Sequence, residues 1–333
     1  MAKSTKIGMF LLNNLIWVIL IFFVIINIFI TPHFFTYRNI INILYHSSIL
    51  GILILAQGIC LISGNFDLSI ESTLAFAPAI AVLVVTKWLP GLDFSFAILI
   101  TLIVGFLVGA FNGYCISMIG INAFLQTLSM LIIIRGLTLW LVPFTIYDLP
   151  KVYTFLGSER IIGNIPISVL TMLLLFGIAN FVIKKMSFGR YIMATGGNPM
   201  ASFISGIDTK KTLFFTFVLS GVLASIAGLL AVGRQAAITS AMGEDMVLLS
   251  FAGAVLGGVS LKGGIGTPLG MLGGALFIGA VDNSLTLLGL NVFIVYAVKG
   301  VLILLAVILD NFKIKAKNAL YSREEIRKFR LER

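Results

Sequence analysis

Residues 8–30 read Gly-Met-Phe-Leu-Leu-Asn-Asn-Leu-Ile-Trp-Val-Ile-Leu-Ile-Phe-Phe-Val-Ile-Ile-Asn-Ile-Phe-Ile, 23 positions without a charged side chain. At about 1.5 Å per residue, a helix of this length crosses a hydrocarbon layer of about 30 Å. A cleaved signal peptide would have a shorter apolar region and a small-residue cleavage site. We therefore expect a retained membrane span.

The same apolar character extends over the whole chain. Of its 333 residues, 59% are hydrophobic and 11% are charged, and the mean hydropathy is +1.10. Soluble domains have roughly 45–50% apolar and about 25% charged residues. A soluble fold of this size could not bury so much apolar surface, which excludes a cytosolic enzyme, a secreted disulfide scaffold, a coiled coil and a disordered chain.

Nine further apolar runs follow the first, so the sequence predicts an all-α integral membrane protein with ten transmembrane helices in a single transmembrane domain over 1–333. The runs are 41–62, 69–86, 95–119, 123–144, 165–183, 213–232, 247–259, 268–288 and 292–309. The runs 69–86 and 247–259 are shorter than the roughly 20 residues that a full crossing requires. We expect short or broken helices there.

Lysine and arginine gather in three places. Lys3 and Lys6 lie before the first span, the segment 184–211 has a net charge of +4, the tail 311–333 has +5, and the other positions sum to −1. With ten crossings, these three segments fall on one face, which the positive-inside rule makes cytoplasmic. Both termini are therefore expected in the cytoplasm, and the basic charge indicates topology and contact with membrane lipid rather than nucleic-acid binding.

The two halves of the chain resemble each other at an offset of about 170 residues. Met-Ile-Gly-Ile-Asn-Ala-Phe at 118–124 matches Leu-Leu-Gly-Leu-Asn-Val-Phe at 287–293, and shorter matches join 51–58 to 221–228 and 74–77 to 249–252. Five crossings separate the copies, so they point in opposite directions through the membrane. We predict an inverted repeat with halves at about 38–145 and 208–310.

Both short runs follow a polar, glycine-containing stretch, at 63–72 in one half and 243–245 in the other. Non-helical backbone at membrane depth is tolerated only where it is buried in protein or lines a wet cavity. Paired interruptions therefore favour a central transport pathway. Ordinary short loops at the membrane face are the alternative.

Polar side chains in or beside the spans are the candidates for this pathway, because they are costly in lipid. They are Asp67, Ser69, Asn112, Asn122, Gln126, Arg135, Asp282 and Asn283. Arg135 is expected to line the pathway or to contact a neighbouring helix. The alternative is that its side chain extends to the outer face of the membrane. Asp67 either faces a solute or caps the third span. Asn112 and Asp282 occupy nearly matched repeat positions.

No enzymatic motif is present in the sequence: it contains no GxxxxGK[ST], HExxH or CxxC pattern. His33 and His46 lack a matching carboxylate cluster, and Cys60 and Cys115 lie in apolar runs without metal-ligand spacing. We expect no catalytic residue, no metal site and no cofactor on this chain. The glycine-rich stretch 257–264 lacks phosphate-loop spacing, and we expect it to allow a tight turn and close packing.

Intramembrane carboxylates suited to proton coupling are scarce, which favours a partner as the energy source. The internal cytoplasmic segment 184–212 has the size of a docking element, and within it Asn198 and Pro199 are expected to start a short helix that Gly206 ends. Such a helix, with an apolar face, either enters a groove on another protein or packs on its own bundle.

Four stretches resemble the permease subunit of ABC-type sugar importers, the ribose, xylose and galactose permease family, which is related to branched-chain amino acid permeases. They are Gly64 to Ser72, similar to G-G-I-D-L-S-V-G-S; Asn122 to Leu128 with Arg135-Gly136, similar to P-A-F-I-x-T-L and R-G; Phe188 to Ile207, similar to F-G-R-x-x-x-A-x-G-G-N-x-x-A-x-x-x-G-I; and Val255 to Gly264, similar to V-L-G-G-x-S-L-x-G-G. The resemblance runs from about residue 36 to 310.

This resemblance implies a multi-pass permease in the inner membrane of a prokaryote, without its own ATPase. It implies three partners: an ATPase subunit that carries ATP and magnesium, an extracytoplasmic solute-binding protein, and a second permease copy or paralogue. The coupling loop to the ATPase would comprise Gly189, Arg190, Gly196, Gly197, Asn198, Ala201 and Gly206.

Three residues depart from the family pattern. Asn65 and Glu71 replace glycines, and Asn122 stands where proline is usual. Glu71 adds a charge beside the third span, which leaves open an unusual pentose, a sugar-like signal molecule or another polar solute. We therefore predict ATP-driven import of a monosaccharide or sugar-like solute, with an ion-coupled secondary transporter or channel as the alternative.

Overall fold

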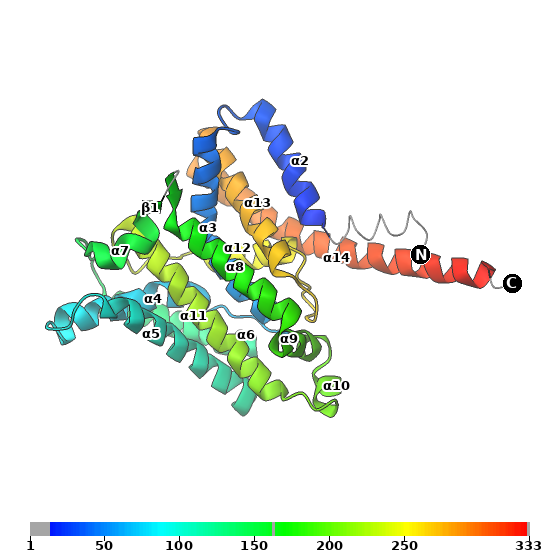
Figure 1. Cartoon of the computed structure of the whole chain (residues 1–333), viewed down its shortest axis with the longest axis horizontal. Coiled ribbons are helices and arrows are strands. Elements are labelled where there is room, and N and C mark those ends of the chain that lie inside the picture. Colours follow the sequence, from blue (N-terminus) through cyan, green and yellow to red (C-terminus); the bar gives the residue numbers. More distant parts are fainter. Residues whose placement is uncertain (1–13, 162–163, 332–333) are drawn as a thin grey trace.

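The computed structural model describes residues 14–161 and 164–331, and these are helical almost throughout (Figure 1). The elements in chain order are α2 (Leu15–Ile30), α3 (Tyr37–Ile62), α4 (Ile70–Leu83), the π-helix η1 (Val84–Trp88), α5 (Phe96–Tyr114), the π-helix η2 (Cys115–Ile119), α6 (Ala123–Leu141), α7 (Lys151–Ser158), β1 (Arg160–Ile161), β2 (Ile165–Pro166), α8 (Ile167–Lys185), α9 (Ser187–Gly197), α10 (Pro199–Ile204), α11 (Thr209–Gln235), α12 (Met246–Leu256), α13 (Pro268–Leu287) and α14 (Val292–Leu331). The strands β1 and β2 form one small antiparallel hairpin.

Each of the ten predicted spans coincides with a helix. Among the described residues, eight helices are long and apolar enough to cross a membrane, and α2 and α12 are shorter apolar helices. The third predicted span is α4, 14 residues long, which η1 extends to Trp88. Positions 8–13 of the first predicted span, Lys3, Lys6 and the last two residues of the basic tail lie outside the described residues.

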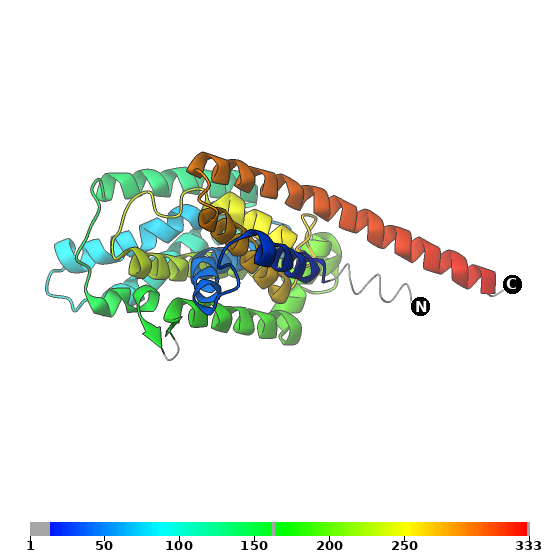
Figure 2. The same ribbon diagram turned by 90° about the horizontal axis from the view of Figure 1, so that it is seen from above.

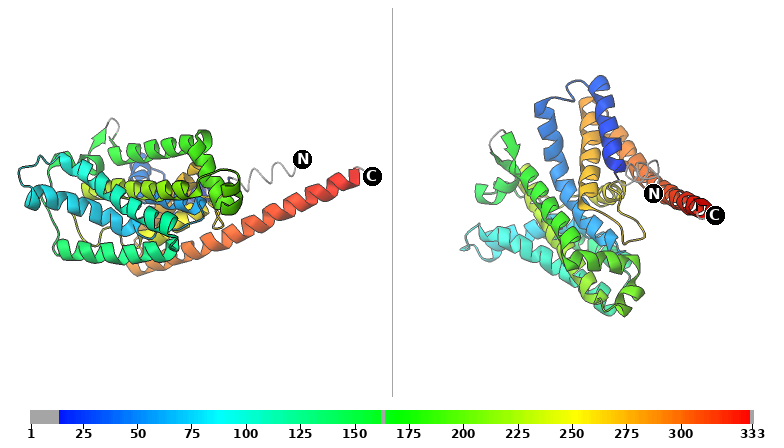
Figure 3. Two further views of the ribbon diagram at one scale, coloured as in Figure 1. Left: turned by 90° about the horizontal axis from the view of Figure 1, so that it is seen from below. Right: turned by 45° about the vertical axis from the view of Figure 1, so that its right-hand side comes forward.

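The two halves make equivalent helix contacts. α3 packs against α12 and α13, and its repeat counterpart α11 packs against α4 and α5. Within the halves, α4 contacts α5 and α6 just as α12 contacts α13 and α14. In Figure 3 (right), α13 accordingly lies between α3 and α2. The first helix of each half therefore lies among the helices of the other half, so that the halves interlock.

α3 and α11 run in opposite directions. Near one end, His46 at the start of α3 contacts Arg234 at the end of α11. Near the other end, Cys60 late in α3 shares an apolar cluster with Phe217 early in α11. The contact pattern and these directions are those expected of an inverted repeat.

The Gly-x-Asn-x-Phe sequence found in both halves forms the same turn before α6 and α14. Gly120 and Gly289 adopt φ angles of +86° and +67°, a left-handed conformation that glycine reaches without steric cost. Asn122 then accepts hydrogen bonds from the backbone N–H groups of Phe124 and Leu125, and Asn291 accepts one from Phe293. The repeated residues are thus helix-start signals.

α6 and α14 lie along one side of the molecule and α8 along the opposite side (Figure 2). α6 and the membrane-length part of α14, Val292–Leu309, are the least buried of the candidate spans. α14 then continues beyond the bundle as one helix to Leu331 (Figures 1 and 2). The predicted tail from residue 311 is therefore a helical extension of the last span.

α5 and α11 approach each other closely through small residues. Gly105, Gly109 and Gly113 recur every four residues on α5, and a Cβ at Gly109 would lie 2.4 Å from the carbonyl oxygen of Phe217. Small residues at this spacing let two membrane helices pack backbone to backbone. This contact ties the first half to the second.

We expect Gly109→Ala to destabilise the fold by about 1–3 kcal/mol, because the added methyl group must push α5 away from α11. The measurement is the thermal unfolding temperature of the purified chain in detergent, which should fall. Gly177→Ala in α8 is the matched control, since no atom of a neighbouring element would lie within 4 Å of its added methyl group. Equal unfolding temperatures for the two variants would contradict the close contact between α5 and α11.

Candidate functional site

Six of the eight predicted pathway residues fall into two groups near opposite ends of α3, and Asn122 and Arg135 belong to neither group. Asp67, Ser69, Asn112 and Gln126 lie near its C-terminal end, whereas Asn283 bonds to Asn39 near its N-terminal end. Asn39 and Cys60 are 21 residues apart on α3, which corresponds to about 30 Å of helix. The structure does not bring the eight residues into one site.

The first group forms a continuous chain of hydrogen bonds, here called the Asp67 network. The Asp67 carboxylate accepts from the Ser69 hydroxyl at 2.6 Å, the Ser69 backbone N–H at 3.0 Å and the Ser220 hydroxyl at 2.7 Å. The Asn112 amide donates to the Ser69 hydroxyl oxygen at 2.9 Å, and the Gln126 amide donates to the Asn112 side-chain oxygen at 3.3 Å.

The Asp67 network joins four elements. Asp67 and Ser69 belong to the segment between α3 and α4, Asn112 to α5, Gln126 to α6 and Ser220 to α11. Asp67, Ser69, Asn112 and Ser220 are fully or almost fully buried, whereas Gln126 is partly exposed. The chain of polar groups therefore leads from the core to Gln126 on α6. α6 and α14 form the side of the molecule with the least buried candidate spans, here called the open side.

Asn122 is not part of this network. Its side chain is exposed and accepts from the first N–H groups of α6, so its visible role is to cap that helix. Asparagine is one of the residues favoured at a helix N-cap, which accounts for its presence at this position.

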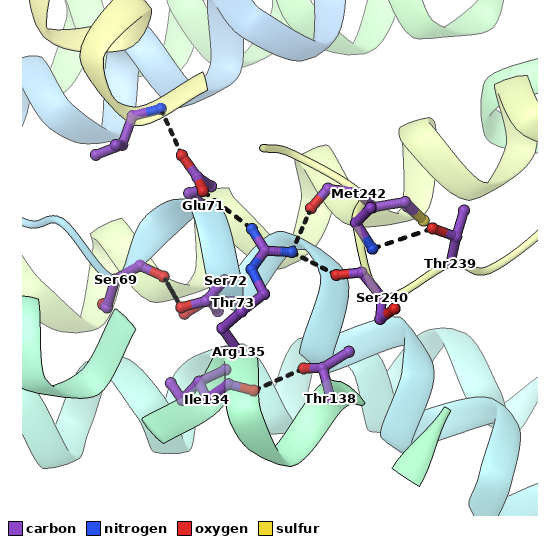
Figure 4. A network of polar contacts seen from close by, with 12 residues as sticks. Ser69, Glu71, Ser72, Thr73, Ile134, Arg135, Thr138, Thr239, Ser240 and Met242 are labelled. Carbon is purple, nitrogen blue, oxygen red and sulfur yellow. Dashed lines mark hydrogen bonds and ion pairs between the residues drawn. The ribbon is translucent and has the colours of Figure 1, made fainter. Parts of the chain in front are cut away.

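Arg135 joins helices rather than extending to the surface (Figure 4). One guanidinium nitrogen lies 3.0 Å from the Glu71 carboxylate, and the other donates to the carbonyl oxygens of Ser240 at 2.5 Å and Met242 at 3.1 Å. The second oxygen of Glu71 accepts from the Val247 backbone N–H at 3.2 Å, in the first turn of α12. We call this arrangement the Glu71–Arg135 clamp.

The clamp links the two halves of the repeat. Glu71 lies on α4 and Arg135 on α6, whereas Ser240, Met242 and Val247 belong to the connection between α11 and α12 and to the start of α12. The side chains of Glu71 and Arg135 are 10% and 13% exposed. Glu71, which departs from the family pattern, is therefore paired inside the protein.

Asp282 and Asn283 fasten α13 to its neighbours at the other end of the bundle. Asp282 pairs with Lys299 of α14 at 2.9 Å, and Asn283 exchanges two amide hydrogen bonds of 2.9 Å with Asn39 of α3. Asn112 and Asp282 match in the repeat, and inversion of the repeat places them at opposite ends.

The predicted coupling segment forms the two short helices α9 and α10. Asn198 caps α10 by accepting from the Ala201 N–H at 2.9 Å, Pro199 is its first residue, and Gly206 follows it with φ +84°. Asp208 then caps α11, and the hydrogen bond from the Lys211 backbone N–H lowers the pKa of its carboxyl group. The local structure expected from the sequence is present.

The apolar side of α10 is uncovered. Met200, Phe203 and Ile204 are 69%, 67% and 78% exposed. The alternative in which this helix packs its apolar side on its own bundle is therefore wrong. Arg190 and Ala201 are also exposed, whereas Gly189 is buried against the end of α8.

Gly196 allows α9 to pack closely against the end of α3. A Cβ at Gly196 would lie 1.8 Å from the Ile62 carbonyl oxygen and 2.9 Å from the Gly264 nitrogen, and the Gly264 N–H donates to Ile62 at 2.8 Å. Gly263 and Gly264 have φ angles of +79° and +74°. The glycine-rich stretch 257–264 thus makes the tight turn and close packing that the sequence predicts.

Two polar residues near the Asp67 network were missed by the sequence reasoning. Ser220 gives no sequence signal, because its role depends on contact between distant segments. Gln57 is fully buried on α3, one turn before Cys60, and neither side-chain polar atom has a hydrogen-bond partner. An amide inside an apolar run is a signal that could have identified it.

The described residues, 14–161 and 164–331, contain no group of three or more His, Cys, Asp or Glu side chains placed to hold a metal ion. The chemical groups of the Asp67 network are hydroxyls, amides and one carboxylate. They can exchange hydrogen bonds with a polar, uncharged solute.

Interlocked inverted halves built from ten apolar helices, with buried polar groups between them, are the architecture of a membrane transport protein. The family described as "Branched-chain amino acid transport system / permease component" matches residues 39–307. The chain belongs to this family.

Curated relatives agree with this assignment. The ribose import permease protein RbsC of Haemophilus influenzae is 34% identical over 316 residues, covering 93% of this chain and 97% of the relative. RbsC of Bacillus subtilis is 34% identical over 293 residues, covering 87% and 90%. The galactose/methyl galactoside import permease protein MglC of Escherichia coli is 29% identical over 329 residues, covering 91% and 95%. No solved structure matches the chain.

Proposed function

We propose that this chain is the membrane-spanning permease subunit of an ATP-driven importer and that it translocates a monosaccharide or sugar-like solute. The observation that carries the proposal is the match, over almost the whole chain, to relatives named as ribose and galactose import permeases. ATP and magnesium would bind to a separate ATPase subunit. This chain would contribute the pathway and the mechanical connection.

The Asp67 network is the proposed solute-contacting part of the pathway. Its amides and hydroxyls match the alternating donors and acceptors of a sugar, and each hydrogen bond is weak enough to be exchanged for release. In the conformation described here these groups are bonded to one another. Alternating access requires a second state in which they separate and the solute takes their place.

The coupling segment is the proposed connection to the ATPase. The exposed Met200, Phe203 and Ile204 of α10 would enter a groove on that subunit. Movement of α9 would pass through the contact between Gly196 and Ile62 to the end of α3. The chain continues from there directly into Asp67 and Ser69, so the segment that moves is joined to the pathway.

The remaining partners would occupy other surfaces. The extracytoplasmic solute-binding protein would bind at the end opposite α10, and a second permease copy or paralogue would cover the open side formed by α6 and α14. Gln126 of the Asp67 network lies on α6. A pathway between two copies would therefore include this network. The charge pattern supports cytoplasmic termini.

Co-purification tests the ATP-driven assignment. The tagged chain is extracted from its native membrane in mild detergent, and associated proteins are identified by mass spectrometry. We expect an ATPase subunit to co-purify with the unaltered chain and to be lost from the double variant Phe203→Ser/Ile204→Ser. The variant Phe144→Ser, which removes an even more exposed aromatic residue at the other end of the bundle, should keep it. Recovery of the permease alone, with uptake that is blocked by an uncoupler and insensitive to ATP depletion, would instead establish a secondary transporter.

We expect Asn112→Ala to reduce sugar uptake by roughly tenfold, since two hydrogen bonds of the Asp67 network are lost. Together they are worth about 2 kcal/mol, and about 1.4 kcal/mol corresponds to a factor of ten. Uptake of a radiolabelled sugar that the unaltered chain imports, normalised to the amount of chain in the membrane, is the measurement. Asn122→Ala is the control: it removes an exposed cap worth about 1 kcal/mol of stability and should keep near-normal uptake. The same loss in both variants would remove the basis for assigning the network to the pathway.

A further inference from the structure

An apolar slot of about 170 Å³ lies between α8 and α11. α3 contributes its floor through Leu55 and Ile59, and α9 closes one end through Phe188 and Ile192. All the lining side chains are apolar. Two of them, Ile178 on α8 and Leu219 on α11, are 51% and 37% exposed, so the slot opens outward on the side of the bundle that would face lipid.

The length of the slot matches one leaflet of a bilayer. Its lining residues on α8 extend from Leu175 to Ile183, which corresponds to about 12 Å of helix. Half of the hydrocarbon core of a bilayer is about 15 Å thick. One acyl chain lying along α8 would therefore fill the slot from the middle of the membrane towards α9.

Two lysines stand at the α9 end of the slot. Lys185 follows Ile178 by seven residues on α8, and Lys211 precedes Val222 by eleven residues on α11. Seven and eleven residues are close to two and three helical turns, so both lysines lie on the helix faces that line the slot. Lys211 also contacts Asp208 at 3.3 Å, but the segment 184–211 keeps a net charge of +4. A positive charge at the end of an apolar slot is complementary to a phospholipid with an anionic headgroup.

From the slot, its length and its flanking charges, we infer that an anionic phospholipid binds here, with one acyl chain in the slot and its phosphate beside Lys185 and Lys211. The site is distinct from the Asp67 network and from the apolar side of α10. Because Phe188 and Ile192 of α9 form the end of the slot, a bound lipid would also support α9 in the position seen here. Binding itself does not depend on which solute the chain transports.

Native mass spectrometry of the full-length chain in mild detergent tests this inference, with phosphatidylglycerol and phosphatidylcholine of identical acyl chains offered together. We expect one tightly held lipid with at least a fivefold preference for phosphatidylglycerol. Val222→Phe fills the slot and should reduce lipid occupancy at least fivefold. Leu173→Phe, on the opposite, exposed side of α8, is the matched control and should bind lipid normally.

The double variant Lys185→Gln/Lys211→Gln changes only exposed side chains and does not alter the core. It should abolish the preference for phosphatidylglycerol while the slot still accepts a chain. Lys210→Gln, on the opposite side of α11, should keep the preference. Equal binding of the two lipids by the unaltered chain, or efficient disulfide formation between two copies that carry Ile178→Cys, would overturn the inference, the latter because a second copy would then cover the slot.

Discussion

Replacing Arg135 with methionine should lower the free energy of unfolding by about 3–5 kcal/mol, the cost of leaving a buried carboxylate without its cation. Glu71 would keep only the Val247 N–H, and the carbonyl groups of Ser240 and Met242 would lose their donor. The measurement is thermal unfolding in detergent, supported by the fraction of the chain that elutes as a monodisperse species.

Two further variants separate the charge from the size of the side chain. The double variant Glu71→Gln/Arg135→Met also removes the Glu71 carboxylate, which Arg135→Met leaves unpaired. It should recover much of the stability that Arg135→Met loses, because a neutral pair avoids the desolvation of an ion. Arg135→Lys keeps the charge without the planar fork that reaches both Glu71 and the carbonyl groups, so its stability should be intermediate. A double variant as unstable as Arg135→Met would show that the ion pair is not what makes the clamp necessary.

Replacing Gly196 with leucine should nearly abolish sugar uptake. Its side chain would begin 1.8 Å from the carbonyl oxygen of Ile62, a position that backbone occupies. Overpacking costs about 3 kcal/mol. This energy would lower the population of molecules in which α9 packs on the end of α3 roughly hundredfold. Uptake of a radiolabelled sugar that the unaltered chain imports, per copy in the membrane, is the readout.

The neighbouring glycine provides the control. A Cβ at Gly197 would meet only the Gly264 Cα, at 3.9 Å, so Gly197→Ala should transport normally. A fluorescence-detected elution profile will show whether Gly196→Leu remains folded. A folded Gly196→Leu variant with full uptake would contradict the proposal that the contact between α9 and α3 transmits movement of an ATPase subunit.

The helices, the repeat and the short α10 could be predicted from the sequence because each depends on local signals. Apolar runs marked the spans, and Asn198, Pro199 and Gly206 marked the start and end of one short helix. The relation between the halves followed from matching segments. These features depend on neighbouring residues or on simple counts.

The composition of the site could not be predicted in the same way. Glu71 and Arg135 are 64 positions apart, and Asp67 and Ser220 are 153 apart, so their pairing depends on how helices pack. Asn122 has the polarity of a pathway residue, yet its side chain caps the N-terminus of α6. Inversion of the repeat also places Asn112 and Asp282 at opposite ends, although their sequence positions correspond.

The exchange of first helices between the halves affects biosynthesis. When α3 leaves the ribosome, α12 and α13, against which it packs, have not yet been made. The polar groups at its ends, including Asn39, which bonds to Asn283 of α13, must wait for more than 200 residues of further synthesis. Contacts this distant in sequence form late. A chain that ends before α13 would therefore leave α3 without its partners, a state suited to recognition by membrane chaperones and proteases.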